Sequence, residues 1–300
     1  MKQSYQMSSK FSSNASTTHN NYRQSMSPNV SRVISFTSGK GGVGKTTLVV
    51  NTAIGLARLG KSVLILDADL GLANVDIMLG IKPKYTLQDL FEKKRSLKEI
   101  IVNGTEGISI IPAASGVESL CNLTSDQCYT LMEAVEEIAH TFDYLLIDTQ
   151  AGIGSNVMYF NSAASEIVCV INPEPTSMTD AYALIKVLAR DYGEKKINVV
   201  ANQVADEKEG WQSFKRLSGA VNKYLSSMEL NYLGWVPKDP MVVDAIREQK
   251  PLVGIYPSSR PALALNRLAA RIDEEFVTAR VKGGMQFFFK QLLEQSSANL

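Results

Sequence analysis

A glycine-rich run with two lysines is the part of the chain best suited to chemistry. Residues 38–47 read Ser-Gly-Lys-Gly-Gly-Val-Gly-Lys-Thr-Thr. Glycines let backbone N–H groups approach phosphate oxygens closely, the closing lysine supplies charge for the β- and γ-phosphates, and the next hydroxyl can bind Mg²⁺. The run therefore predicts a nucleotide-binding phosphate loop. Its candidate binding residues are Gly39, Lys40, Gly41, Gly42, Val43, Gly44, Lys45, Thr46 and Thr47.

The segments on either side of this loop have the pattern that it requires. Residues 32–37 are a short run rich in β-branched residues, and residues 46–59 have apolar residues at helical spacing before Gly60. Strand, glycine loop and helix in this order place a phosphate at the N-terminus of a helix, where free N–H groups and a partial positive charge favour an anion. A chance glycine-rich turn would not have both flanks.

Three carboxylates follow apolar runs that read as strands. Asp67 and Asp69 come directly after residues 63–66, and Asp148 comes after residues 144–147. In open parallel sheets, ligands bind beyond the carboxyl ends of the strands. Carboxylates there can hold Mg²⁺, usually through its waters, or orient an attacking water. A single aspartate at a strand end is common, but three of them beside a phosphate loop predict a site for a nucleotide with Mg²⁺.

Strand-like and helix-like patterns alternate along the chain from residue 33 onward. This alternation predicts an α/β fold with a doubly wound, mostly parallel sheet that is covered by helices on both faces. The predicted strands are residues 33–36, 63–66, 108–111, 144–147, 167–171, 197–201 and 232–236, and the helical patterns include 125–140 and 179–192.

The two ends of the chain differ from this alternating part. Residues 1–29 are rich in Ser, Asn, Thr and Gln, so we predict a disordered tail there and a single domain over residues 30–280. Residues 281–300 contain two glycines followed by a short amphipathic pattern, which is typical of a helix that lies in a membrane interface. A helix packed on the domain is the alternative. The membrane-facing candidates are Met285, Phe288, Phe289 and Leu292.

Composition restricts the classes of function. The formal net charge is +1, so we expect no direct contact with nucleic acid. The three cysteines, Cys121, Cys128 and Cys169, form no Cys-x-x-Cys pair, which disfavours a metal cluster. The odd cysteine count and the lack of a secretory signal fit a cytoplasmic protein. No apolar run approaches the ~20 residues that a membrane-spanning helix needs.

Three motifs together resemble the deviant Walker A ATPases of the MinD/ParA group. They are residues 40–46, 67–76 and 147–153, and the first contains Lys40, a residue that an ordinary phosphate loop does not need. Within the group, residues 110–116 and 174–186 are similar to the FlhG (FleN) regulators of flagellar number and not to a division-site MinD. The resemblance extends over about residues 30–294.

The resemblance implies an ATPase that binds ATP with Mg²⁺ and forms a face-to-face homodimer. Lys40 would then reach the nucleotide of the second subunit, and Asp69 would position the hydrolytic water. Gln150 stands where relatives usually have a small residue, which bears on packing near the γ-phosphate. The other implied roles are phosphate binding by Lys45, the metal site at Thr46, Asp67 and Asp148, the adenine site at Asn202, Pro237 and Asp239, and contact with the second nucleotide at Glu174.

The resemblance also implies partners and a location. The partners would be the FlhF GTPase, a flagellar transcription activator such as FleQ, flagellar basal-body components and an anionic membrane surface. The protein would be cytoplasmic, and peripheral on the inner face of the cell membrane in its ATP state. The alternatives are a MinD-like or ParA-like positioning ATPase, a metal-cluster carrier or reductase of the same fold, and a module that binds ATP without hydrolysing it.

Overall fold

The computed structural model describes residues 31–69, 73–113 and 141–275, together with single positions between 124 and 138. The predicted tail over residues 1–29 lies outside the described residues. So do the predicted C-terminal helix with Met285, Phe288, Phe289 and Leu292, and most of the helical pattern at 125–140. The proposed division of the chain into three regions therefore stays a prediction.

Strands and helices alternate through most of the described part of the chain. The strands are β1 (Arg32–Ser38), β2 (Val63–Ala68), β3 (Val102–Asn103), β4 (Ile108–Ile111), β5 (Tyr144–Ala151), β6 (Glu166–Ile171), β7 (Lys196–Val204) and β8 (Glu229–Pro237). The helices are α1 (Lys45–Arg58), α2 (Val75–Met78), α3 (Leu87–Phe91), α4 (Leu97–Ile100), the 3-10 turn η1 (Thr105–Gly107), α6 (Ser155–Ala163), α7 (Pro175–Asp191), α8 (Glu207–Tyr224), α9 (Pro240–Arg247), α10 (Leu252–Ile255) and α11 (Arg260–Glu275).

Among the described residues, eight strands form one sheet in the order β3-β4-β2-β5-β1-β6-β7-β8. The described pairings are parallel except that of β3 with β4, so the predicted doubly wound, mostly parallel sheet is confirmed. All seven predicted strands are present. The eighth, β3, has only two residues at the sheet edge, which is too short to give a sequence pattern.

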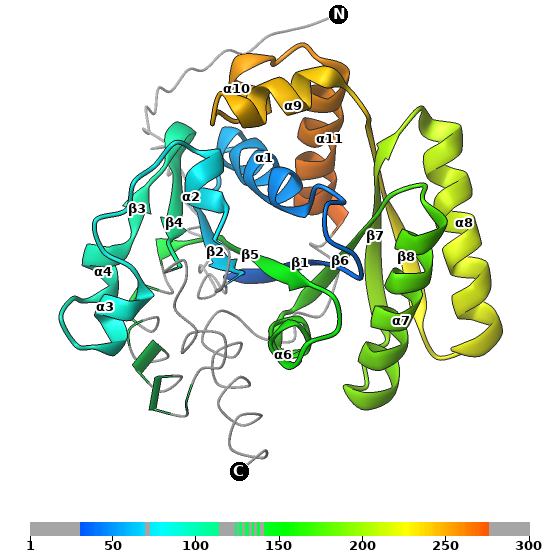
Figure 1. Ribbon diagram of the computed structural model, residues 1–300, viewed down its shortest axis with the longest axis horizontal. Coiled ribbons are helices and arrows are strands. Elements are labelled where there is room, and N and C mark those ends of the chain that lie inside the picture. Colours follow the sequence, from blue (N-terminus) through cyan, green and yellow to red (C-terminus); the bar gives the residue numbers. More distant parts are fainter. Residues whose placement is uncertain are drawn as a thin grey trace, which may run out of the picture.

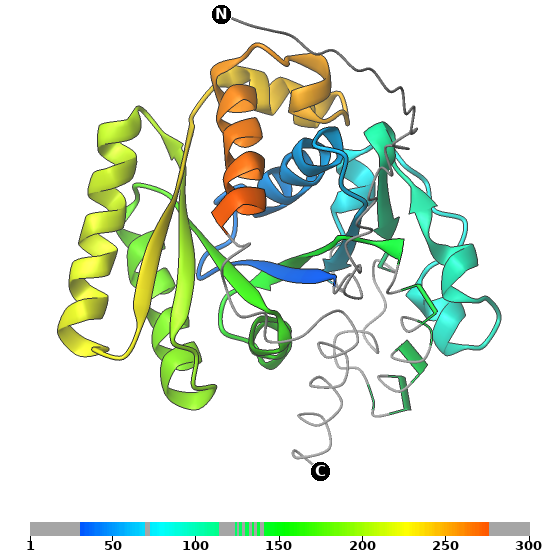
Figure 2. The same cartoon turned by 180° about the vertical axis from the view of Figure 1, so that it is seen from behind.

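Helices cover both faces of the sheet (Figures 1 and 2). On β5, Leu145 packs in the cluster that contains residues of α3, α4 and α6, whereas the next residue, Leu146, packs in the cluster that contains residues of α1 and α11. Consecutive residues of a strand point to opposite faces, so a fully buried strand reads as a continuous apolar run. A third cluster joins α7 and α8 to the half of the sheet formed by β6 and β7.

The strand register brings the carboxyl ends of the central strands together. Asp67 at the end of β2 pairs with Asp148 of β5, and Asp148 pairs on its other side with Phe36 of β1. The phosphate loop follows β1 directly, so the predicted carboxylates lie at the edge of the sheet where that loop begins. In the part of the chain that the structure describes, no helix is long and apolar enough to span a bilayer.

One helix starts earlier than its sequence pattern predicted. The apolar spacing suggested a start at residue 179, but α7 begins at Pro175, with Glu174 as its N-cap. Proline suits the first helical position, because the N–H that it lacks would have no partner within the helix. The earlier start places Glu174 and Thr176 beside the phosphate loop.

Candidate active site

The phosphate loop connects β1 to α1 through backbone conformations that glycine permits. Gly42 and Gly44 have φ angles of 80° and 85°, in the left-handed region. Helix α1 begins at Lys45, and no side chain caps its start and no acidic residue lies in its first turn. The first N–H groups of a helix have no partner inside it, so they are available to an anion here.

Two glycines of the loop lie where a side chain would not fit. A Cβ atom on Gly39 would lie 2.2 Å from the carbonyl carbon of Asp180 in α7. A Cβ atom on Gly44 would lie 2.5 Å from the amide nitrogen of Asn202 in β7. The loop is therefore in close contact with α7 at its beginning and with β7 at its end.

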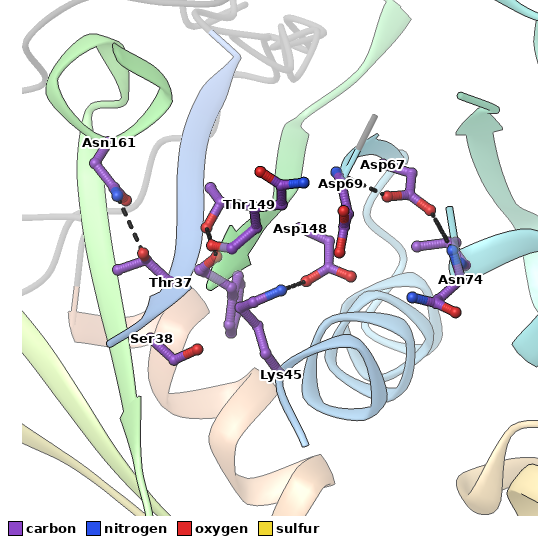
Figure 3. A network of polar contacts seen from close by, with 12 residues as sticks. Thr37, Ser38, Lys45, Asp67, Asp69, Asn74, Asp148, Thr149 and Asn161 are labelled. Atoms are coloured by element: carbon purple, nitrogen blue, oxygen red, sulfur yellow. Dashed lines mark hydrogen bonds and ion pairs between the residues drawn. The ribbon is translucent and has the colours of Figure 1, made fainter. Parts of the chain in front are cut away.

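Lys45 and Asp148 form a buried ion pair under the loop (Figure 3). The Nζ atom of Lys45 donates to Oδ1 of Asp148 at 2.6 Å, and both side chains are almost completely buried. The second oxygen of Asp148, Oδ2, is also buried and has no hydrogen-bond partner among the described residues. A buried carboxylate oxygen without a donor is costly, so this atom marks a place for a ligand or its water.

Asp67 lies beside this pair and accepts three backbone hydrogen bonds. They come from the N–H groups of Asn74 at 2.9 Å, Val75 at 3.0 Å and Asp69 at 3.1 Å (Figure 3). Burial, and then the charge of Asp148, raise the pKa of Asp67 from 3.8 to about 7, while the three N–H groups oppose that rise. Asp148 thus lies close enough to Asp67 to raise its pKa, while the ammonium group of Lys45 pairs with Asp148.

This set of oxygens fits a divalent cation. Asp67 and Asp148 oppose each other across neighbouring strands, and Thr46 lines the same cavity as Lys45 and Asp69. Carboxylates, a hydroxyl and waters are the ligands that Mg²⁺ prefers, and a cation there would offset the repulsion that raises the pKa of Asp67. The predicted metal residues Thr46, Asp67 and Asp148 therefore remain the candidates for holding Mg²⁺.

A cavity of about 870 Å³ extends from the phosphate loop to β8 and α9. This volume lies within the range of small-molecule and cofactor sites. Asp69 lines it, as the predicted role in positioning water requires, whereas Gln150 is half-buried and is not among the lining residues. The predicted site residues that line the cavity are Gly41, Gly42, Val43, Gly44, Lys45, Thr46, Thr47, Asp69, Asn202, Pro237 and Asp239.

Lys40 lies at the rim and contacts the start of α7. Its Nζ atom is 2.5 Å from Oε2 of Glu174 and 3.0 Å from the hydroxyl oxygen of Thr176. The hydrogen bond from Lys40 lowers the pKa of Glu174, which keeps that carboxylate charged. The two side chains are 37% and 56% exposed, so water screens the pair and little free energy is needed to separate it.

The predicted adenine residues lie at the ends of two neighbouring strands. Pro237 is the last residue of β8, and the Asp239 carboxylate caps α9 by accepting from the Met241 N–H at 2.9 Å. The Asn202 amide donates to the carbonyl oxygen of Val43 at 2.7 Å. Asn202 thus braces the phosphate loop as well as lining the cavity, and its contact with a base stays a prediction.

A buried polar network below the loop was not predicted. The side-chain amide of Asn161 in α6 donates to the Thr37 hydroxyl at 3.1 Å and accepts from the Ser35 hydroxyl at 2.8 Å (Figure 3). The Thr149 hydroxyl donates to the carbonyl oxygen of Phe36 at 3.0 Å. Both sets of bonds tie the segment after Asp148 to the strand that carries the phosphate loop.

These features together define a P-loop nucleoside triphosphatase. The family model for ParA, described as NUBPL iron-transfer P-loop NTPase, matches residues 29–273. The chain therefore belongs to the ParA/MinD family of P-loop ATPases, which use ATP with Mg²⁺.

Two relatives align along most of the chain, and one of them is a flagellum site-determining protein. The chain is 41% identical over 263 residues to the antiactivator FleN of Pseudomonas aeruginosa, which covers 88% of the chain and 94% of FleN. It is 33% identical over 266 residues to the flagellum site-determining protein YlxH of Helicobacter pylori, covering 88% of the chain and 90% of the relative.

Solved structures of MinD have the same fold. The septum site-determining protein MinD of Pyrococcus horikoshii, complexed with Mg-ADP, superposes with a TM-score of 0.67 at 26% identity and covers 84% of this chain and 100% of that one. MinD in the MinC:MinD complex of Aquifex aeolicus superposes with a TM-score of 0.64 at 29% identity, covering 84% and 100%.

The family description mentions iron transfer, and the described residues offer no cluster site. Within them, no group of three or more His, Cys, Asp and Glu side chains is placed to hold a metal ion. Cys169 is buried in β6, where burial raises the pKa of its thiol to about 12 and keeps it protonated. Cys121 and Cys128 lie outside the described residues.

Proposed function

We propose that this ATPase is a switch that controls the number and placement of flagella. The observation that carries the proposal is the 41% identity to the antiactivator FleN over 88% of the chain, supported by the match to a second flagellar protein. Both alignments extend across the domain that contains the phosphate loop, the carboxylates and α7. The likeness is therefore not limited to the nucleotide-binding motifs that all members of the family share.

The site suits a switch whose dimer reports bound ATP. Lys45 and the N–H groups at the start of α1 would bind the β- and γ-phosphates, and Asp69 would orient the attacking water. Mg²⁺, held by Thr46, Asp67 and Asp148, would neutralise phosphate charge. Lys40 would leave Glu174 and contact the nucleotide of a second subunit. Slow hydrolysis fits this role, because such a switch acts through the populations of its two states.

The dimer cycle is tested at Asp69. Asp69→Ala keeps the phosphate loop but loses the carboxylate that positions water, so the protein should stay dimeric in ATP. Light scattering after size exclusion would compare wild type and Asp69→Ala in Mg·ATP and Mg·ADP. We expect a dimer for the variant in Mg·ATP and a monomer for both proteins in Mg·ADP. A variant that remains monomeric in saturating ATP would contradict the dimer switch.

The proposed partners follow from the flagellar role. They are the FlhF GTPase, a FleQ-like transcription activator and basal-body components, each bound by one of the two states. We also propose peripheral attachment to the inner face of the membrane through Met285, Phe288, Phe289 and Leu292, whose spacing favours an interfacial helix. Deleting residues 284–300 should abolish ATP-dependent sedimentation with anionic vesicles and leave nucleotide binding intact.

The flagellar role is tested by complementation in Pseudomonas aeruginosa that lacks FleN. An antiactivator opposes a transcription activator, so cells without it should overexpress flagellar genes and carry extra flagella. This chain should restore the normal number. Lys45→Ala serves as the control that cannot use nucleotide. Flagella per cell are counted by electron microscopy, with the chain expressed at the level of FleN. A number that stays elevated with the wild-type chain would contradict the proposal.

A division-site role like that of MinD is the second candidate. It is favoured by 33% identity over 249 residues to MinD of Synechocystis and by the MinD structures described above. The discriminating experiment expresses the chain in cells that lack MinD and scores minicells. Loss of minicells without an effect on flagellar number would favour the division-site role.

A further inference from the structure

Gln203 lies at an irregular point of β7, next to Asn202. The pairing of β7 with β8 shifts register between Asn202 and Val204, so Gln203 is an extra residue in its strand, a β-bulge. Its φ angle is 58°, in the left-handed region of the backbone, which residues other than glycine adopt at a cost in energy. Such strain persists where the surrounding structure holds it, and it concentrates at functional sites.

The bulge turns two consecutive side chains toward the phosphate loop. On a regular strand, neighbouring residues point to opposite faces, so Asn202 and Gln203 would not both reach the same loop. Here the Gln203 amide donates to the carbonyl oxygen of Gly42 at 3.2 Å, and the Asn202 amide donates to that of Val43 at 2.7 Å. Two neighbouring carbonyl groups of the loop are therefore held from one strand end.

Holding these carbonyl groups orients the N–H groups of the same peptides. A trans peptide unit is planar, and its C=O and N–H point in opposite directions. Fixing the Gly42 carbonyl toward Gln203 thus aims the Val43 N–H away from β7, and fixing the Val43 carbonyl does the same for the Gly44 N–H. Carbonyl oxygens turned the other way would repel phosphate oxygens.

We propose that Gln203 is a positioning residue for nucleotide binding, which acts through the Gly42 carbonyl to hold the glycine turn in its phosphate-binding conformation. The same bond ties the phosphate end of the cavity to the end of β7, where Asn202 lines the predicted base end. This bond therefore fixes the position of the phosphate end of the site relative to its predicted base end. The proposal depends on nucleotide binding by the loop and does not depend on the flagellar role.

The test uses Gln203→Gly in the full chain. Glycine removes the amide and adopts the left-handed conformation without strain, so the melting temperature without nucleotide should be unchanged or higher. The Kd for Mg·ADP, measured by titration calorimetry, should rise about 3- to 10-fold, which corresponds to the loss of one hydrogen bond. ADP is the probe because it separates binding from ATP-driven dimerisation.

The chain offers a matched control in Gln249. It is exposed, has a φ angle of 53°, and is not among the residues that line the cavity. Gln249→Gly makes the same substitution in the same backbone conformation and should leave the Kd unchanged. An equal rise in Kd for both variants would overturn the proposal, and so would wild-type affinity in Gln203→Gly. A lower melting temperature alongside the weaker binding would assign Gln203 a merely structural role.

Gln203→Glu is the second variant, which keeps the length of the side chain and its strain. A carboxylate cannot donate to the Gly42 carbonyl and adds negative charge near the phosphates, so binding should weaken more than in Gln203→Gly. If Gln203→Gly does not fold, this variant decides alone. Wild-type affinity for Mg·ADP in Gln203→Glu would overturn the proposal.

Discussion

The Nζ atom of Lys45 lies 2.6 Å from Oδ1 of Asp148, and Asp148 in turn faces Asp67 across β2 and β5. The ammonium group that a phosphate loop needs for its ligand is thus engaged by a carboxylate. Nucleotide therefore has to compete with Asp148 for Lys45. We expect the Mg²⁺ that binds with ATP to offset this competition, because its charge suits the Asp148 carboxylate that Lys45 would leave.

The first prediction concerns the buried pair. Lys45→Met should abolish Mg·ATP binding and lower the free energy of unfolding without ligand by about 3–5 kcal/mol, since Asp148 is left buried and unpaired. The double variant Lys45→Met/Asp148→Asn should recover much of that stability without recovering binding. Urea unfolding and calorimetry measure the two quantities. A single variant as stable as wild type would contradict the role of the pair.

The second prediction is a pH dependence centred on Asp67. Its pKa rises from 3.8 to about 7 on folding, so the folded protein binds this proton more tightly than the unfolded chain. The contribution to stability is therefore fully present below pH ~4 and is lost as the pH rises through about 7. Without nucleotide or Mg²⁺, the melting temperature of wild type should fall over this range more steeply than that of Asp67→Asn. Parallel curves would show that Asp67 titrates normally.

The third prediction concerns Lys40 at the rim. Lys40→Ala breaks only an exposed pair, so the melting temperature should not change, but the Mg·ATP dimer should be lost because the second nucleotide no longer meets this charge. Lys94→Ala is the control, because Lys94 also pairs with an exposed glutamate, Glu92, far from the loop in sequence. Light scattering in Mg·ATP measures the molar mass and so distinguishes dimer from monomer. If Lys40→Ala forms the dimer at the same ATP concentrations as the wild type, the predicted role of Lys40 is excluded.

The fourth prediction tests the polar network of Asn161. Asn161→Ala removes one buried hydrogen-bond partner from each of the Thr37 and Ser35 hydroxyls, so the free energy of unfolding should fall by about 2–3 kcal/mol. Asn222→Ala, on the exposed side of α8, should change it by less than about 0.5 kcal/mol. Denaturant titration compares the two. Equal effects would mean that the network does not stabilise the fold.

Most of the candidate site could be located in the sequence because its residues directly follow recognisable strands. The phosphate loop, Asp67, Asp69 and Asp148 each lie at the end of a recognisable strand, and the parallel register then brings them together. The pairing of Lys40 with Glu174 could not be predicted in this way. It depends on the start of α7 at Pro175, four residues before its apolar pattern begins.

The contacts of Gln203 and Asn161 were missed for a different reason. A bulge depends on how β7 pairs with β8, and the sequence of β7 alone does not indicate that pairing. Asn161 occupies a helix position that reads as ordinary polar surface, yet the fold buries it completely between α6 and β1. Adjacency to the predicted Asn202 was the one signal in the sequence that pointed to Gln203.

The close contact of Gly39 with α7 has a mechanical consequence. At this point the phosphate loop meets the backbone of Asp180 and Ala181 with no side chain between them. Side chains can absorb a small displacement by changing rotamer, but a backbone contact passes it on. Because the helix that presents Glu174 to Lys40 meets the loop through backbone atoms, we expect a displacement of the loop to move α7 with it.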